Sequence, residues 1–160
     1  MKRAVSVAAL CTVLGGCGFH PLYDEHLSPQ LATIFVEPVP ERDGYELRNT
    51  LIDLLGSDGT TAGKRYHLKI TLNETQQGVA LQNDATITRY NDRLVASYVL
   101  TDARGTTLTS GTQNGLSSYN VATSPYSTLA AQQDADARAA QDMAERIRLD
   151  LAAWFRRGPK

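Results

Sequence analysis

A short hydrophobic segment at the amino terminus sets how much of this chain is available to fold. Lys2 and Arg3 precede a hydrophobic run from Ala4 to Leu14, and Gly15-Gly16 closes it. A charged start, an apolar run and small residues before a cut describe a secretory signal peptide. The run is about a dozen residues long, well short of the ~20 that a transmembrane helix needs. We therefore expect residues 1–16 to be removed.

The residue after this segment is a cysteine. Leu14-Gly15-Gly16-Cys17 resembles a bacterial lipobox, in which the thiol is acylated before cleavage and the cysteine becomes the new amino terminus. Cys11 fits the pattern less well, because Ala8 rather than leucine stands three residues before it. Gly18 is not the aspartate that resembles an inner-membrane retention signal, which favours the outer membrane. The alternative is an ordinary secretory signal with a chance cysteine; the prediction is lipid attachment at Cys17.

Composition then limits the mature chain. Removing residues 1–16 leaves 160 − 16 = 144 residues, enough for one domain with a core. Loss of Lys2 and Arg3 changes the formal net charge from −1 to −3, so no global field draws the mature protein to anionic partners, and any anion binding must be local. The two cysteines go to the signal and to the lipid, which leaves no disulfide. We expect a tether at 17–30, a single domain at 31–157 and a short tail at 158–160.

The first half of the domain shows a strand, a helix and a second strand. Ala32–Pro38 is short and β-branched, which is typical of a strand. Arg42–Leu55 places leucines at helical spacing on one face, and Tyr66–Asn73 alternates apolar and polar residues as a half-buried strand does. A helical crossover of this length predicts that the two strands are parallel. Gln76-Gln77-Gly78 indicates a break after the second strand.

The second half predicts a hairpin. A third strand from about Thr86 to Thr101 alternates in the same way, and Asp102-Ala103-Arg104-Gly105 is typical of a turn with glycine in the left-handed position. The fourth strand, Thr106 to about Val121, is rich in Thr and Ser and poor in large apolar residues. That composition favours an exposed edge strand, where another chain can pair.

The last element is a long helix. Ser124-Pro125 supplies an N-cap residue followed by proline at the first helical position. The residues of its apolar face recur every three or four positions: Tyr126, Ala130, Ala137, Ala140, Ala144, Ile147, Leu151 and Trp154. The predicted fold class is therefore α+β, a two-layer sandwich with a four-stranded mixed sheet and two helices on one face (β-α-β-β-β-α). The other sheet face is expected to be polar and free.

No arrangement of residues typical of catalysis is found. His20 and His26 fall in the tether, and His67 is alone on the outward side of a strand. The chain has no G-x-S-x-G, Walker A or G-x-G-x-x-G motif. Asp134 and Asp136 point about 200° apart on a helix, so we interpret them as solvated charges rather than metal ligands. We expect a protein that is not an enzyme, with no catalytic residues, no metal and no cofactor.

The mature start carries a family resemblance. Cys17-Gly18-Phe19-His20-Pro21-Leu22-Tyr23 resembles the start of the lipopolysaccharide-assembly lipoproteins, the LptE family, which begin with Cys-Gly, an aromatic residue and histidine. The entry to the alanine-rich final helix, Ser124-Pro125-Tyr126, resembles shorter members of that family, and the order of elements agrees over nearly the whole mature chain. The chain departs from the family in lacking the extended carboxy-terminal tail of some relatives, and its strands offer no residue-level match.

The resemblance implies a partner and a substrate. In that family the lipoprotein sits as a plug in the lumen of a large outer-membrane β-barrel of the LptD type, aids its assembly and can contact lipopolysaccharide. The expected partners are therefore this barrel, lipopolysaccharide and the membrane, with no nucleic acid. An auxiliary lipoprotein of a lipid-transporting ABC system remains the alternative, since such proteins also begin with a lipidated cysteine.

Candidate binding residues follow from charge and aromatic character. Arg89, Tyr90 and Arg93 place two guanidinium groups four residues apart with an aromatic ring between them, which suits the phosphates of lipopolysaccharide. The alternative is a solvated strand end. Three apolar tether residues are candidates for contact with the barrel wall or for covering the domain's own edge: Phe19, Leu22 and Tyr23. A basic carboxy-terminal cluster complements the helix dipole: Arg156, Arg157 and Lys160.

Overall fold

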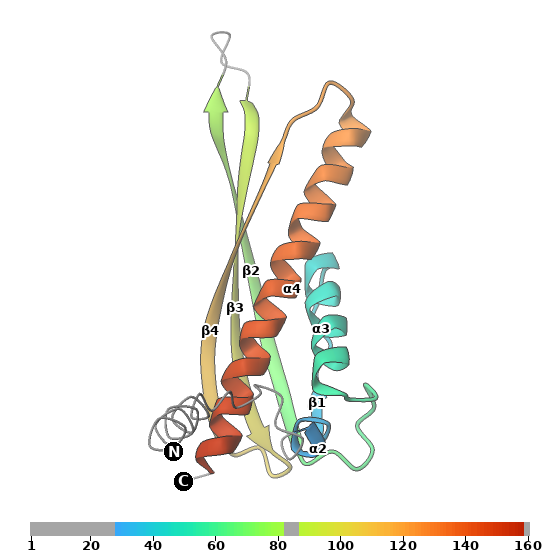
Figure 1. The fold of residues 1–160 in the computed structure, drawn as a ribbon, viewed down its shortest axis with the longest axis vertical. Coiled ribbons are helices and arrows are strands. Elements are labelled where there is room, and N and C mark those ends of the chain that lie inside the picture. Colours follow the sequence, from blue (N-terminus) through green and yellow to red (C-terminus); the bar gives the residue numbers. More distant parts are fainter. Residues whose placement is uncertain (1–27, 82–86, 159–160) are drawn as a thin grey trace, which may run out of the picture.

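The protein folds as a sheet with its helices gathered on one side (Figure 1). The computed structural model describes residues 28–81 and 87–158. In chain order the elements are α2 (Ser28–Leu31), β1 (Ile34–Val36), α3 (Arg42–Leu55), β2 (Tyr66–Leu81), β3 (Ile87–Asp102), β4 (Thr107–Asn120) and α4 (Pro125–Arg157). Sixteen residues in each of β2 and β3 make strands of about 50 Å, and the 33 residues of α4 make a rod of similar length.

The sheet has the order β1-β2-β3-β4. β1 pairs with β2 in parallel, and the other two pairings are antiparallel, so the predicted mixed sheet is confirmed. β4 lies at an edge, as its composition indicates. The predicted break at Gln76–Gly78 is wrong: these residues continue β2 and pair with Asp92, Asn91 and Tyr90. Pairing with a strand already in place outweighs the weak strand preference of Gln and Gly.

The core lies between the sheet and the two long helices. Alternate residues of β3 are buried, which matches the period of a strand covered on one side only. Leu47, Leu51 and Leu55 of α3 are at most 2% exposed, and their spacing places them on one helical face. The remaining fully buried large side chains come from every layer: Ile34, Val36, Leu68, Leu94, Leu100, Met143, Ile147 and Leu151. The two-layer α+β prediction is confirmed.

Glycines in β4 let α4 approach the sheet. Gly111 pairs with Tyr98, and a Cβ at this glycine would lie 2.5 Å from the Tyr98 hydroxyl oxygen. The ring therefore lies across the glycine, and its hydroxyl donates to Asp150 of α4 at 2.9 Å. A Cβ at Gly115 would lie 3.0 Å from the Met143 sulfur. β4 is poor in large side chains because other residues occupy the space above it.

The ends of the elements follow the sequence in part. The Asp102 carboxylate accepts from the amides of Arg104 and Thr106, and Gly105 has φ 84°, as the turn prediction requires. α4 begins with Pro125 at its first position, but the Ser124 side chain makes no capping bond. The Thr128 hydroxyl instead accepts from the amide of Ala122 at 2.9 Å.

The start of the described chain differs from the expected extended tether. Ser28–Leu31 forms a short helix, α2, and Leu31 is 5% exposed in the core. The helical turn directs the Leu31 side chain into the core, and burial of this side chain stabilises the turn. Among the described residues, no helix combines the length and the apolar character needed to cross a membrane.

Candidate functional site

The side of the sheet that faces away from α3 and α4 is polar. We call it the open face, and its exposed side chains include Lys69, Thr71, Asn73, Thr75, Arg89, Arg93, Ser97, Thr112, Asn114 and Leu116. Both described long helices lie on the other side of the sheet (Figure 1). His67 lies toward this face against Phe35, with ring centroids 5.7 Å apart, and is not a member of the one group of possible metal ligands found among the described residues. The expectation of a polar, free sheet face is confirmed for the described residues.

Two of the three candidate lipopolysaccharide residues share the open face. Arg89 and Arg93 are both exposed and four positions apart on β3, which sets their Cα atoms about 13 Å apart along the strand. Arg93 lies between Thr75 of β2 and Leu116 of β4, and Leu116 is 68% exposed. The structure therefore places two guanidinium groups and an apolar side chain on one surface.

Tyr90 is not part of this surface. Successive strand residues point to opposite faces, so Tyr90 points toward the helices, and its ring stacks on Tyr119 at 5.7 Å with an angle of 24° between the planes. The prediction that an aromatic ring stands between the two arginines is wrong. The Tyr119 hydroxyl accepts from the Gln76 amide at 2.7 Å, so the tyrosine pair belongs to the inner layer.

On the side of the sheet that faces the helices, acidic residues gather near Tyr90 and Tyr119. We call Asp43, Glu74, Asp92 and Asp136 the acidic cluster. Burial, followed by the neighbouring charges of Asp43 and Asp136, raises the pKa of Glu74 to about 7. Burial also raises the pKa of Asp43 and of Asp92 above the ordinary aspartate value. Burial and the negative charges of Asp92 and Asp136 raise the pKa of Tyr119 to about 12.

The sequence interpretation missed this cluster. Asp136 is 3% exposed, so it is not the solvated helix charge that was expected. Asp134 does lie on the exposed side of α4, where it pairs with Arg138. The sequence did carry a signal. Asp136 lies one position from Ala135 and three from Ala139, so it falls on an alanine-rich helical face, and the structure shows that both alanines are buried.

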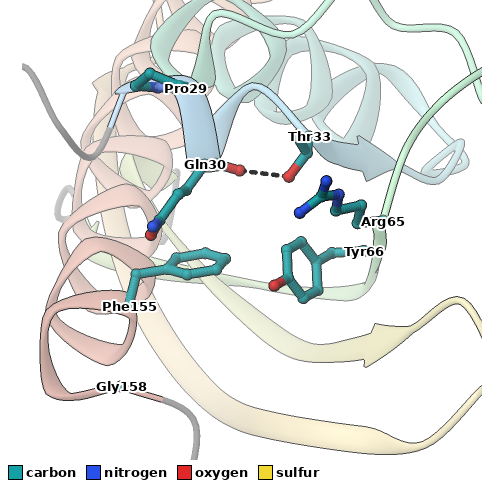
Figure 2. Close-up of a pocket in the computed structure, with 7 residues that line it drawn as sticks. All are labelled: Pro29, Gln30, Thr33, Arg65, Tyr66, Phe155 and Gly158. Atoms are coloured by element: carbon teal, nitrogen blue, oxygen red, sulfur yellow. Dashed lines mark hydrogen bonds between the residues drawn. The ribbon is translucent and has the colours of Figure 1, made fainter.

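The opposite end of the molecule carries a cavity of about 590 Å³. Figure 2 shows its lining, which comes from α2, β2 and the end of α4: Pro29, Gln30, Thr33, Arg65, Tyr66, Phe155 and Gly158. Phe155 and Tyr66 meet edge to face with centroids 5.2 Å apart, and the Thr33 hydroxyl donates to the Gln30 carbonyl. Arg65 is the one charged residue among the described residues of the lining. The cavity marks the end at which the described chain enters the fold.

Two of the remaining candidates lie at the end of α4. Arg156 and Arg157 are exposed in the last turn of α4, as a helix-dipole complement requires. The other candidates lie outside the described residues: Cys17, Phe19, His20, Leu22, Tyr23, His26 and Lys160.

Comparison with known proteins agrees with this architecture. Residues 31–151 match the family model LptE, described as lipopolysaccharide-assembly. A Rickettsia prowazekii protein described as uncharacterized is 28% identical over 151 residues, which cover 91% of this chain and 93% of that protein. A solved structure from Caulobacter crescentus CB15, described as a candidate lipoprotein, is 30% identical with a TM-score of 0.69, covering 81% of this chain and 96% of that one.

A more distant structure shows the same fold alone. The rare lipoprotein B of Shewanella oneidensis is 8% identical, with a TM-score of 0.56 over 75% of this chain and 93% of that one. The family match extends over most of the described domain and includes α3, all four strands and α4 as far as residue 151. The chain therefore belongs to the lipopolysaccharide-assembly family LptE.

Proposed function

We propose that this protein is a lipid-anchored partner of an outer-membrane β-barrel of the LptD type, that it occupies the barrel lumen, and that it aids delivery of lipopolysaccharide to the outer leaflet. The family match carries the proposal. The lipobox-like Leu14-Gly15-Gly16-Cys17 supports the anchor, and two similar solved structures are described as lipoproteins.

The shape and polarity of the domain support a position in a lumen. Strands and helix of about 50 Å are longer than the ~30 Å hydrocarbon thickness of a bilayer, so the domain can extend through a barrel wall's full height. The open face offers mostly hydroxyl and amide groups, and the interior of a wide barrel is polar. Apolar side chains are instead collected between the sheet and α3 and α4.

Direct contact with lipopolysaccharide is assigned to Arg89 and Arg93. Each guanidinium can form two parallel hydrogen bonds to one phosphate, and the spacing of about 13 Å along the strand suits two separate phosphates. The exposed Leu116 beside Arg93 adds an apolar surface for an acyl chain. The role is binding and not catalysis, because in the described chain no nucleophile, base and orienting group converge on the open face.

Co-purification tests the partner. The tagged full-length protein is extracted with detergent from the envelope of its native cells, and the captured proteins are identified by mass spectrometry. We expect one large barrel at a ratio near one to one. Capture of components of a lipid-transporting ABC system without a barrel would instead support the alternative function and contradict this one.

Charge reversal tests the lipopolysaccharide surface. Arg89→Asp with Arg93→Asp should weaken binding of purified lipopolysaccharide by about tenfold or more at low salt, since charged hydrogen bonds contribute about 1.5–3 kcal/mol each. Arg156→Asp with Arg157→Asp makes the same change in charge at the other end of the molecule and should leave binding within about twofold. Equal affinities for the two double variants would remove Arg89 and Arg93 from the binding surface.

A further inference from the structure

Three carboxylates from different elements meet where the apolar core ends. Asp43 lies in the first turn of α3, Glu74 in β2 and Asp136 in α4. One oxygen from each lies within 4.8 Å of the other two. The three residues are far apart in the sequence, so the fold itself brings the negative charges together against their mutual repulsion.

A fourth carboxylate faces the same layer and has no partner. Asp92 is 0% exposed, and neither of its carboxylate oxygens makes a hydrogen bond within the described chain. Its neighbours across the sheet are Gln76 and Ser117. The Ser117 hydroxyl donates to Asp136 at 2.6 Å. The Gln76 amide donates to Tyr119 at 2.7 Å, and its proximity partly offsets the rise that burial causes in the pKa of Asp92.

This combination favours a bound cation. A carboxylate removed from water is costly unless it is hydrogen-bonded, paired or coordinated to a metal. No ion pair found between described residues involves a member of the acidic cluster; the three that occur are Lys64–Asp58, Arg138–Asp134 and Arg148–Glu145. Among the described residues, four acids therefore meet at one place without an ion-paired cation, and the charge of Arg42 offsets the raised pKa of Asp43 only in part.

We propose that the acidic cluster binds one Ca²⁺ ion, with Asp43, Glu74 and Asp136 as its direct protein ligands and Asp92 beside them. Three oxygens no more than 4.8 Å apart are at most about 2.8 Å from a common centre, close to the 2.3–2.6 Å of Ca²⁺–oxygen bonds. Mg²⁺–oxygen bonds are about 2.0–2.1 Å long and need near-octahedral geometry, so the three carboxylates would have to move closer together for Mg²⁺ than for Ca²⁺. Glu74 is exposed, so water can complete the coordination from that side.

Such an ion would join three elements at the edge of the apolar core. On the inner side of β3, Leu94 is the last fully buried aliphatic side chain toward the start of the strand, and Asp92 and Tyr90 follow it in that direction. The ion joins α3, β2 and α4 at this boundary, in a chain that has no cysteine pair among its described residues. This inference rests on the acidic cluster alone and does not depend on the proposed function.

Calorimetric titration of Ca²⁺ tests the site. The full-length protein in detergent, freed of bound lipid and dialysed against a chelator, should bind one Ca²⁺ with a dissociation constant of about 0.1–1 mM or tighter, the range of extracellular calcium modules. Its thermal midpoint should rise with Ca²⁺ concentration. Absence of saturable binding up to about 10 mM, well above that range, would overturn the proposal.

Matched variants separate this site from general attraction of cations. Asp43→Asn and Asp136→Asn should each weaken Ca²⁺ binding at least tenfold, whereas Asp142→Asn, at an exposed position of the same helix, should change it less than twofold. Each variant removes one negative charge and keeps the side-chain size, and circular dichroism checks that it folds. Equal binding by all three variants would overturn the proposal.

A second probe has a readout of its own. Tb³⁺ occupies Ca²⁺ sites and emits when a nearby aromatic ring absorbs, and Tyr119 interacts electrostatically with Asp92 and Asp136. We expect Tb³⁺ emission that excess Ca²⁺ removes and that Asp136→Asn lacks. Emission that persists unchanged in Asp136→Asn would contradict the assigned ligands.

Discussion

Gly111→Ala tests whether the space above β4 holds the sheet and α4 together. The new Cβ would lie 2.5 Å from the Tyr98 hydroxyl oxygen and 2.6 Å from the ring carbon that carries it. Distances this short force the ring to move. The ring is 4% exposed and its hydroxyl donates to Asp150, so it has no free space to move into without losing that bond.

The magnitude follows from these two costs. Overpacking a filled core costs about 1–3 kcal/mol, and a hydrogen bond to a charged acceptor contributes about 1.5–3 kcal/mol. The Asp150 carboxylate keeps its bond from Gln113 at 2.7 Å, which offsets part of the second cost. We expect the free energy of unfolding to fall by about 2–4 kcal/mol, which lowers the urea midpoint by about 1–2 M for an m value near 2 kcal/mol/M.

Equilibrium urea unfolding, followed by circular dichroism, measures the change. Ser110→Ala on the same strand alters an exposed side chain and should change stability by less than about 0.5 kcal/mol. Tyr98→Leu in the Gly111→Ala background removes the colliding ring, so the double variant should be less unstable than the sum of the single variants. A loss below about 1 kcal/mol for Gly111→Ala, or additive single variants, would refute the close contact as the cause.

Three further predictions concern the core, the acidic cluster and the anchor. Leu51→Ala removes a fully buried side chain and should lower the free energy of unfolding in urea by about 2–5 kcal/mol. Tyr45→Ala on the same helix changes a side chain that is 59% exposed and should lower it by less than about 1 kcal/mol. Similar losses for the two variants would contradict the assigned helical face. The pKa of Glu74 is raised from 4.5 to about 7 in the folded protein. With a chelator present, the folded state therefore keeps a proton that the unfolded chain releases near pH 4.5. The contribution of this group to stability is fully present below about pH 4.5 and is lost as the pH rises through 7. Because Glu74 is exposed, solvent screening limits this loss to about 1 kcal/mol; Glu74→Gln should flatten the pH profile, and a wild-type profile that is already flat would contradict the shift. Cys17→Ser should leave the circular dichroism spectrum unchanged but release the protein from washed membranes of cells without its barrel, and full retention there would argue against the lipid anchor.

Much of the fold was predictable because its information is local. The leucines of Arg42–Leu55 repeat at helical spacing, and the structure has α3 at those bounds. Alternation in the third strand distinguished the buried Leu94 from the exposed Arg93, so the open face was also predictable. The end of the second strand was not, because Gln76–Gly78 are held in β2 by their partners in β3 and not by their own preference.

The candidate site was predictable only in part, for a related reason. Alternation along a strand places Arg89 and Arg93 on one side, and the same rule applied to Tyr90 would have removed it from the site. The apolar spacing of the last helix was extended to Tyr126, yet this residue is 80% exposed because α4 begins beyond the buried layer. Periodicity indicates which residues share a face but not where the opposing layer ends.

Local patterns in the amino-acid sequence were enough to predict α3, α4, the order of the four strands, the polar sheet face and the family, because each of these depends on residues close together in the chain. Which distant side chains meet became known from the folded arrangement. The register of β2, β3 and β4 aligns Glu74, Asp92 and Ser117 on the inner face, and the packing of α3 and α4 adds Asp43 and Asp136. The physical reason is that these contacts arise from strand pairing and helix packing over long sequence separations, which no local pattern records.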